Sequence, residues 1–208
     1  TLKRCLEYAA TFDIPVMLQP LDASLAANGC AHDGEVATRL GLPGIPALAE
    51  SVDLARTLPL VADTLSRFGL KERIRLIASG KMINPGQVAW ALCVGADFVG
   101  SARGFMFALG CIQALQCNKN TCPTGITTHD KELQRGLVVE DKAERVANLA
   151  RNMMYEVGVI AHSCGVQSPQ ELGRQHVHVI SPEGIPVPVL DTFPDQATRP
   201  EYLAAADA

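Results

Sequence analysis

The sequence predicts an α/β fold built on parallel strands, and three observations in one stretch of chain support this. Two short apolar runs, Ile74–Ala78 and Phe98–Val99, have the composition of buried strands. Residues 84–94 between them show helical periodicity, and a glycine follows each run, at Gly80 and Gly100. Because parallel neighbours need a long crossover, this order predicts one βαβ unit.

The composition is that of a globular domain. The chain has 208 residues, of which 48% are apolar and 19% charged, enough to bury a core. A net charge of −4 leaves no basic footprint for nucleic acid. No apolar run is long enough to span a membrane, and residues 1–20 lack the order of a signal peptide, so we expect a cytoplasmic protein without a membrane partner.

The pattern of the first 68 residues predicts three helices and one strand. Thr1–Phe12 reads as a helix and Ile14–Leu18 as an apolar strand. A loop rich in Ala, Gly and Pro follows, with a short helix over residues 35–40. Pro46 suits a first helical position, and helical spacing continues over residues 47–68.

The two predicted strand ends are candidate phosphate sites. In α/β folds, ligands collect where strands end, because glycine lets the backbone approach and the next helix presents unpaired N–H groups. Tight turns also need glycine for conformational reasons, so the glycines alone leave both interpretations open. The candidate residues are Ser79, Gly80, Lys81, Gly100, Ser101, Ala102 and Arg103.

Three closely spaced cysteines are the candidate metal ligands. Cys111, Cys117 and Cys122 form a C-x5-C-x4-C pattern, which does not fit the C-x2–4-C pairs of zinc sites. In a reducing compartment such a group favours ligation over disulfides, and three thiolates followed by Pro123 suit a three-iron cluster. The alternative is that the three are small buried apolar side chains.

Several long runs of distinctive sequence lie in the second part of the chain. Residues 58–170 include LIASGK, GADFVGSARGFMFALGCIQALQC, NTCPTG and IAHSCGV. These resemble the flavin-binding domain of glutamate synthases. The resemblance implies a (βα)8 barrel, FMN phosphate contacts at Ser79, Gly80, Gly100 and Ser101, and a [3Fe–4S] cluster held by Cys111, Cys117 and Cys122.

Residues 1–56 carry a second resemblance. FDIPVMLQPLD and GCAHDGEVATRLGLPGIPALAESVDLAR are similar to a middle segment of dihydroorotases, which are metal-dependent barrels. In that family a metal-ligating His commonly occupies the place where Gln19 stands here, and an amide is a poor substitute for imidazole. His32 and Asp33 lie in a loop that the resemblance associates with substrate, but a solvated His is the simpler interpretation.

Together the two resemblances predict a partial barrel. We expect a dihydroorotase-like segment over 1–56, a glutamate synthase-like half-barrel over 57–193 with three or four parallel strands, and a loose tail over 194–208, in a chain that is a recombinant of two families. Open sheet edges favour self-association, so we expect a homo-oligomer.

After residue 136 the sequence pattern predicts two more helices and a strand. Glu140–Val157 has strong helical periodicity, and Ser168 with Pro169 marks a helix start. His176–Val179 alternates as a strand, which would place His176 and His178 on one face. An amidohydrolase-type metal pair there, or one at His162 and Cys164, is less expected than ordinary packing or solvation.

The function that the resemblance implies is reductive nitrogen transfer to 2-oxoglutarate, with FMN and a cluster as cofactors. No glutaminase nucleophile is visible, so ammonia and electrons would come from a further domain or subunit. Two alternatives stay open: a catalytically silent recombined scaffold, and a dihydroorotase-like hydrolase. Catalytic residues are not assigned.

Overall fold

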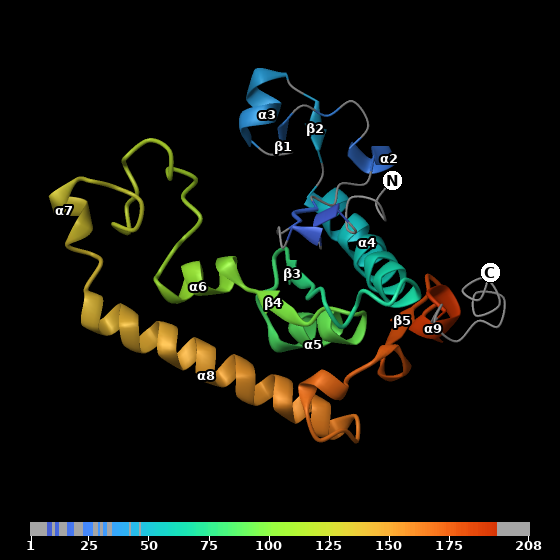
Figure 1. Ribbon diagram of the computed structural model, residues 1–208. Coiled ribbons are helices and arrows are strands. Elements are labelled where there is room, and N and C mark those ends of the chain that lie inside the picture. The colour runs from blue at the N-terminus through green and yellow to red at the C-terminus, as the bar shows by residue number, and fades with distance from the viewer. Residues whose placement is uncertain are drawn as a thin grey trace. The chain divides into compact units, whose positions relative to one another are not determined.

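In the computed structural model, whose helices and strands Figure 1 labels, the chain divides into two compact units. Unit 1 comprises Thr1–Gly80, Cys93–Phe98 and Gly173–Ala208, and unit 2 comprises Lys81–Leu92 and Val99–Leu172. The structure describes residues 8–9, 11–12, 16–18, 23–26, 29, 31–32, 35–41, 43–45 and 47–194. Within these ranges helices and short strands alternate, which confirms the α/β class.

Among the described residues from Ala23 to Ile45, unit 1 has four short elements. They are α2 (Ala23–Ala26), β1 (Ala31–His32), α3 (Glu35–Leu40) and β2 (Gly44–Ile45). Strands β1 and β2 pair in parallel, Ala31 with Gly44 and His32 with Ile45. Helix α3 confirms the short helix predicted over residues 35–40.

The strand predicted over Ile14–Leu18 is wrong where it can be checked. Residues 16–18 are in no strand, and Met17 is 96% exposed. An apolar run becomes a strand only when a neighbour accepts its backbone hydrogen bonds, and the described residues supply none here. The helix predicted over Thr1–Phe12 lies mostly outside the described residues, although residues 8, 9 and 11 are helical.

The core of unit 1 forms around α4 (Ala47–Arg67), which confirms the helix predicted over 47–68. Val61 and Leu65 are buried at 3% and 0% exposure, and the side chains of Leu70, Ile74 and Leu76 pack against them. These last two residues were predicted as strand. Strand β3 begins only at Ile77 (Ile77–Ser79), because the preceding residues pack against α4.

Strand β3 and β4 (Phe98–Gly100) form a two-stranded sheet. The backbone N–H groups of Asp97 and Phe98 both donate to the Leu76 carbonyl, at 2.8 and 3.0 Å. The Asp97 carboxylate accepts from the Leu76 N–H at 2.6 Å and pairs with Lys71. This network fixes the start of β4 against the segment that leads into β3.

Unit 2 opens with α5 (Pro85–Cys93), whose start follows a known capping pattern. Asn84 Oδ1 accepts from the Gln87 N–H at 2.9 Å, and Gln87 Oε1 accepts from the N–H groups of Ile83 and Asn84. Pro85 occupies the first helical position, where its missing N–H costs nothing. The helix predicted over 84–94 is therefore confirmed, with its start explained by local side chains.

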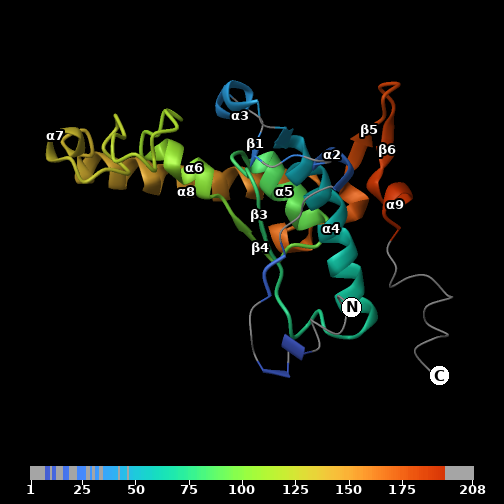
Figure 2. The same ribbon diagram turned by 90° about the horizontal axis from the view of Figure 1, so that it is seen from above.

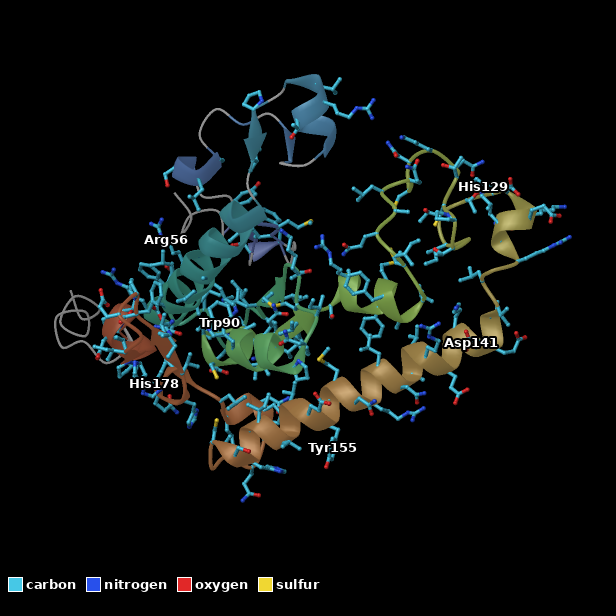
Figure 3. All side chains as sticks on the ribbon, turned by 180° about the vertical axis from the view of Figure 1, so that it is seen from behind. Arg56, Trp90, His129, Asp141, Tyr155 and His178 are labelled. Atoms are coloured by element: carbon cyan, nitrogen blue, oxygen red, sulfur yellow. The ribbon has the colours of Figure 1, made fainter. Side chains whose placement is uncertain are left out.

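The rest of unit 2 is built on α8 (Val139–Ser163), which confirms the predicted helix and extends it beyond Val157. Helix α6 (Ala102–Ala108) packs along it (Figure 2). The short helix η1 (Pro169–Glu171) also contacts α8. The short helix α7 (Lys131–Gln134) was not predicted. Tyr155 projects from the side of α8 away from α6 and is 73% exposed (Figure 3).

After Gly173, the described part of unit 1 is a hairpin between two short helical segments. In chain order these are η2 (Arg174–His176), β5 (His178–Ile180), β6 (Pro186–Pro188) and α9 (Val189–Thr192). Strands β5 and β6 pair antiparallel, with Val179 opposite Val187.

The prediction that His176 and His178 share one strand face is wrong. His176 belongs to η2, and its Nδ1 accepts a hydrogen bond from the Gly173 N–H at 3.0 Å. That local bond closes a turn and removes His176 from the strand. Only His178 lies in β5.

Candidate functional site

The turn after β3 contains three of the predicted phosphate residues. Ser79 ends the strand and is exposed. Gly80 and Lys81 both have positive φ, at 156° and 56°, and Lys81 is one of four described non-glycine residues with this conformation. A non-glycine residue with positive φ is uncommon. The glycine at position 80 is thus needed for the turn itself, which is one of the two interpretations that the sequence left open.

The second group of phosphate residues surrounds the start of α6. Gly100 ends β4, and Ser101 is the residue that precedes the helix. The Ser101 side chain does not cap α6; its hydroxyl donates to the Met82 carbonyl instead. This hydrogen bond therefore joins Ser101, at the start of α6, to Met82, the residue that follows Lys81. Ala102 and Arg103 are exposed in the first turn of α6.

Gly104 makes the Ser101 contact possible. A Cβ built on Gly104 would lie 2.6 Å from the Ser101 Oγ and 3.8 Å from the Ile83 Cα. Residues Ser79 and Gly80 belong to unit 1 and the other five phosphate candidates to unit 2. The structure thus brings Ser101 together with the Lys81–Met82 segment within unit 2.

The three predicted ligand cysteines lie along one loop of unit 2, between α6 and α7. Cys111 is half-buried, Cys117 exposed and Cys122 buried, and all three are free thiols. In the part of the chain that the structure describes, no group of three His, Cys, Asp or Glu side chains is gathered closely enough to hold a metal ion. The shared loop is therefore observed, and a closed ligand set is not.

Cys122 has the most unusual environment of the three. Its Sγ lies 3.4 Å from the Thr124 hydroxyl oxygen. That hydroxyl, followed by the backbone N–H and the hydroxyl of Thr127, lowers the pKa of the Cys122 thiol to about 6, against the opposing effect of burial. Cys122 consequently has thiolate character at neutral pH, and the thiolate is the form that binds metals.

The loop around Cys122 is held by hydrogen bonds from its own residues. The Thr128 hydroxyl donates to the Asn120 carbonyl at 2.7 Å, and Asn120 Oδ1 accepts from the His129 N–H at 2.6 Å. Gln134 Nε2 donates to the Thr128 carbonyl at 2.7 Å. Figure 3 shows His129 beside α7, at the end of this loop. Cys122 thus belongs to a segment whose backbone is fixed on both sides.

The fit of the implied cofactors follows from these observations. For an iron–sulfur cluster, the donor set fits by its chemistry: three thiols on one loop, one of them with thiolate character. For the phosphate of a flavin, the backbone turn with positive φ at Gly80 and Lys81 fits, as do the exposed residues that begin α6.

Among the described residues, the other side chains that the sequence singled out form no metal-binding group. His162 Nε2 lies 3.3 Å from the Gln167 carbonyl, and Cys164 ends α8, so the pair belongs to a helix terminus. His32 lies in β1, whereas Gln19 and Asp33 lie outside the described residues.

Sequence reasoning missed Thr124 and Thr127, which shape the surroundings of Cys122. A signal was available in the pattern of two hydroxyl residues, at positions two and five after Cys122. It also missed the buried ion pair of Asp63 with Arg174 in unit 1, for which no local signal exists. Among the described residues, no helix is long and apolar enough to cross a membrane.

The fold and the cysteine loop define an α/β protein with a candidate cofactor site, and comparison with known proteins places it in a family. The family model described as the conserved region in glutamate synthase matches residues 35–167. The chain therefore belongs to the glutamate synthase family. The match contains every predicted phosphate residue and all three loop cysteines, and it also covers residues 35–56, which carry the dihydroorotase resemblance.

Individual relatives agree with this assignment. The glutamate synthase large subunit-like protein YerD of Bacillus subtilis is 41% identical over 157 residues, which is 76% of this chain and 28% of the relative. An archaeal-type glutamate synthase [NADPH] of Dehalococcoides mccartyi is 27% identical over 185 residues, 84% of this chain and 37% of the relative. The chain thus spans only 28% and 37% of the length of these two proteins.

The second resemblance is also found. A dihydroorotase-like protein of Pseudomonas putida is 59% identical over 61 residues, which is 29% of this chain and 14% of that protein. A dihydroorotase of Syntrophotalea carbinolica is 46% identical over 66 residues. A short segment of this chain is therefore similar to dihydroorotases, and a much longer part is similar to glutamate synthases.

Proposed function

We propose that this chain is the FMN- and iron–sulfur-binding part of a glutamate synthase-type oxidoreductase, incomplete as a single chain. The observation that carries the proposal is the family match over residues 35–167, which includes the cysteine loop and both glycine turns. The reaction class is reductive transfer of an amide-derived nitrogen to 2-oxoglutarate. The names of the matched archaeal-type relatives favour NADPH as the electron source.

In this proposal the backbone turns of the chain bind the FMN phosphate. The N–H groups of Gly80, Gly100, Ser101 and Ala102 donate to the anion, and Lys81 and Arg103 add positive charge. The Ser101 hydroxyl, already bonded to the Met82 carbonyl, orients the start of α6. Ser79 completes the set at the end of β3.

Cys111, Cys117 and Cys122 are the proposed ligands of a [3Fe–4S] cluster. Cys122 is prepared for this role because Thr124 and Thr127 lower its pKa. Bound FMN would supply hydride-level redox chemistry, and the cluster single-electron transfer. The role of the protein is to hold both groups, to exclude water and to set their potentials.

We propose further that the chain forms half of a (βα)8 barrel and functions together with a second polypeptide chain. Ile77 on β3 and Phe98 on β4 are 72% and 59% exposed. Sheets joined by helical crossovers normally have both faces covered, so these side chains favour pairing with a second copy. Ammonia and reducing equivalents would then come from a glutaminase and an electron-donor domain or subunit.

The experiment is visible spectroscopy of the 208-residue protein after incubation with FMN and removal of unbound flavin. We expect a retained flavin spectrum with bands near those of free FMN, and loss of binding in a Gly100→Val, Ser101→Val double variant. A protein that folds and retains no flavin would contradict the flavin part of the proposal.

One specific observation favours a second candidate, a silent recombined scaffold. The chain joins a segment similar to dihydroorotases with a partial match to glutamate synthases, and the described residues gather no metal-binding group. Such a scaffold would fold cooperatively while binding neither FMN nor iron. The same spectra, together with iron analysis, separate the two candidates.

A further inference from the structure

The Thr127 hydroxyl is buried without a hydrogen-bond partner among the described residues. Buried polar groups in native proteins are nearly always satisfied, so such an atom calls for an explanation. Thr127 belongs to the same loop as Cys122, and its backbone N–H and its hydroxyl both lower the pKa of that thiol. The Thr127 hydroxyl is therefore an unused hydrogen-bond donor in the loop that contains the Cys122 sulfur.

Thr124 faces the same sulfur. Its Oγ1 lies 3.4 Å from the Cys122 Sγ, within the range of a hydrogen bond to sulfur. Either atom can donate while the sulfur is a thiol, but only the hydroxyl can donate once the sulfur is a thiolate. The Thr124 hydroxyl thus contacts the Cys122 sulfur directly, and the buried Thr127 hydroxyl on the same loop has no other partner among the described residues.

The backbone holds both threonines in place. The Gly125 N–H donates to the Cys122 carbonyl at 3.1 Å, which closes a turn with Thr124 inside it. A Cβ on Gly125 would lie 2.5 Å from the Leu133 carbonyl oxygen, so this turn packs tightly against α7. Thr128 is 7% exposed, and the hydrogen bond from its hydroxyl to the Asn120 carbonyl fixes the backbone next to Thr127.

We propose that Thr124 and Thr127 are positioning residues for the Cys122 sulfur, and that their hydroxyls donate to it when it ligates a cluster. This inference rests on the proposed function and adds two residues to it. Hydrogen bonds to ligand sulfurs stabilise the more negative, reduced state of an iron–sulfur cluster and so raise its reduction potential. The two threonines therefore set the potential as well as the geometry of the site.

The test uses isosteric and conservative variants of the full chain. Thr124→Val and Thr127→Val remove the hydroxyls and keep the shape, and Thr124→Ser and Thr127→Ser restore a donor. Thr121→Val is the matched control, since Thr121 is adjacent to Cys122 but its exposed hydroxyl lies 3.5 Å from Gln116 Oε1.

In the reconstituted protein, an EPR-monitored redox titration should show a lower potential for each Val variant. We expect a shift of about 59 mV for the double variant, a tenfold change in the one-electron equilibrium constant. The Ser variants and Thr121→Val should match the wild type. Equal potentials in all variants, or Ser variants that behave like Val variants, would overturn the inference.

A second measurement uses the metal-free protein, so that it does not depend on cluster assembly. Iodoacetamide labelling at pH 7, followed peptide by peptide by mass spectrometry, should be about fivefold slower at Cys122 in the Thr124→Val, Thr127→Val variant, because less thiolate is present. Labelling of Cys117 provides the internal reference. Unchanged labelling would overturn the contacts themselves. If the wild type binds no iron but the double variant is still labelled more slowly, only the cluster function and the effect on its potential are contradicted.

Discussion

Arg174 and Asp63 form a buried, two-point ion pair between residues 111 positions apart in the chain. The guanidinium donates to both carboxylate oxygens, at 2.7 and 3.1 Å, and each side chain is 9% exposed. Arg174 also donates to the carbonyls of Pro59 and Phe193. One side chain therefore connects α4 to η2 and to the residue that follows α9.

Arg174→Ala should destabilise the protein strongly. It leaves the Asp63 carboxylate buried without its charge partner, and breaking one side of such a pair costs about 3–5 kcal/mol. Urea denaturation followed by circular dichroism measures the loss. Arg135→Ala is the control, because its ion pair with Glu132 is exposed and its loss should cost less than about 1 kcal/mol. Equal effects of the two changes would contradict this account of unit 1.

Two glycines of unit 2 should respond to alanine with opposite signs. Gly125 has a φ of +79°, and a Cβ there would meet the Leu133 carbonyl oxygen at 2.5 Å, so Gly125→Ala should cost about 1–3 kcal/mol. Gly158 lies inside α8 with nothing within 4 Å of a built Cβ. Gly158→Ala should therefore stabilise the protein by about 0.5–1 kcal/mol. Thermal unfolding distinguishes the two, and a stabilising Gly125→Ala would refute the tight turn.

The carboxyl of Glu183 should titrate below its ordinary value. The Ser181 hydroxyl, and then the backbone N–H of Glu183 itself, lower its pKa from 4.5. Because the folded-state pKa is the lower one, this stabilising effect is present above pH 4.5 and disappears as the pH falls through the folded-state pKa. NMR titration should show the pKa rising toward 4.5 in Ser181→Ala. An unchanged pKa would show that the hydroxyl is not the cause.

The protein should self-associate through the exposed face of the β3–β4 sheet. Light scattering after size-exclusion chromatography should give a mass of twice 22.2 kDa. Phe98→Asp should shift the protein toward monomer, because it places a charge among apolar side chains at the interface. Tyr155→Asp, a change of an exposed aromatic on α8, should not. A monomeric wild type would contradict the pairing of half-barrels.

Helices with a strong periodic pattern were predictable from the sequence, and α4, α5 and α8 all appear where the pattern indicates them. The reason is that their start and stop signals are local, as the Asn84 and Gln87 cap shows. The strands were less predictable. Ile74 and Leu76 are apolar because they pack against α4, and nothing in a short apolar run distinguishes that use from a strand.

The candidate site was predictable in its composition and not in its geometry. The spacing of Cys111, Cys117 and Cys122 identifies the loop, because spacing is a property of sequence. The contact of Thr124 with Cys122 and the burial of the Thr127 hydroxyl depend on how the loop packs against α7, and sequence spacing carries no information on that packing.

The central claim is that the cysteine loop binds an iron–sulfur cluster, and EPR spectroscopy after anaerobic reconstitution with iron and sulfide tests it most directly. We predict a paramagnetic [3Fe–4S] signal in the oxidised wild-type protein, its loss in Cys117→Ser, and its retention in Cys93→Ser and Cys164→Ser. A wild-type protein that folds but gives no iron-dependent signal, or a signal that is lost in Cys93→Ser or Cys164→Ser while Cys117→Ser retains it, would contradict the account.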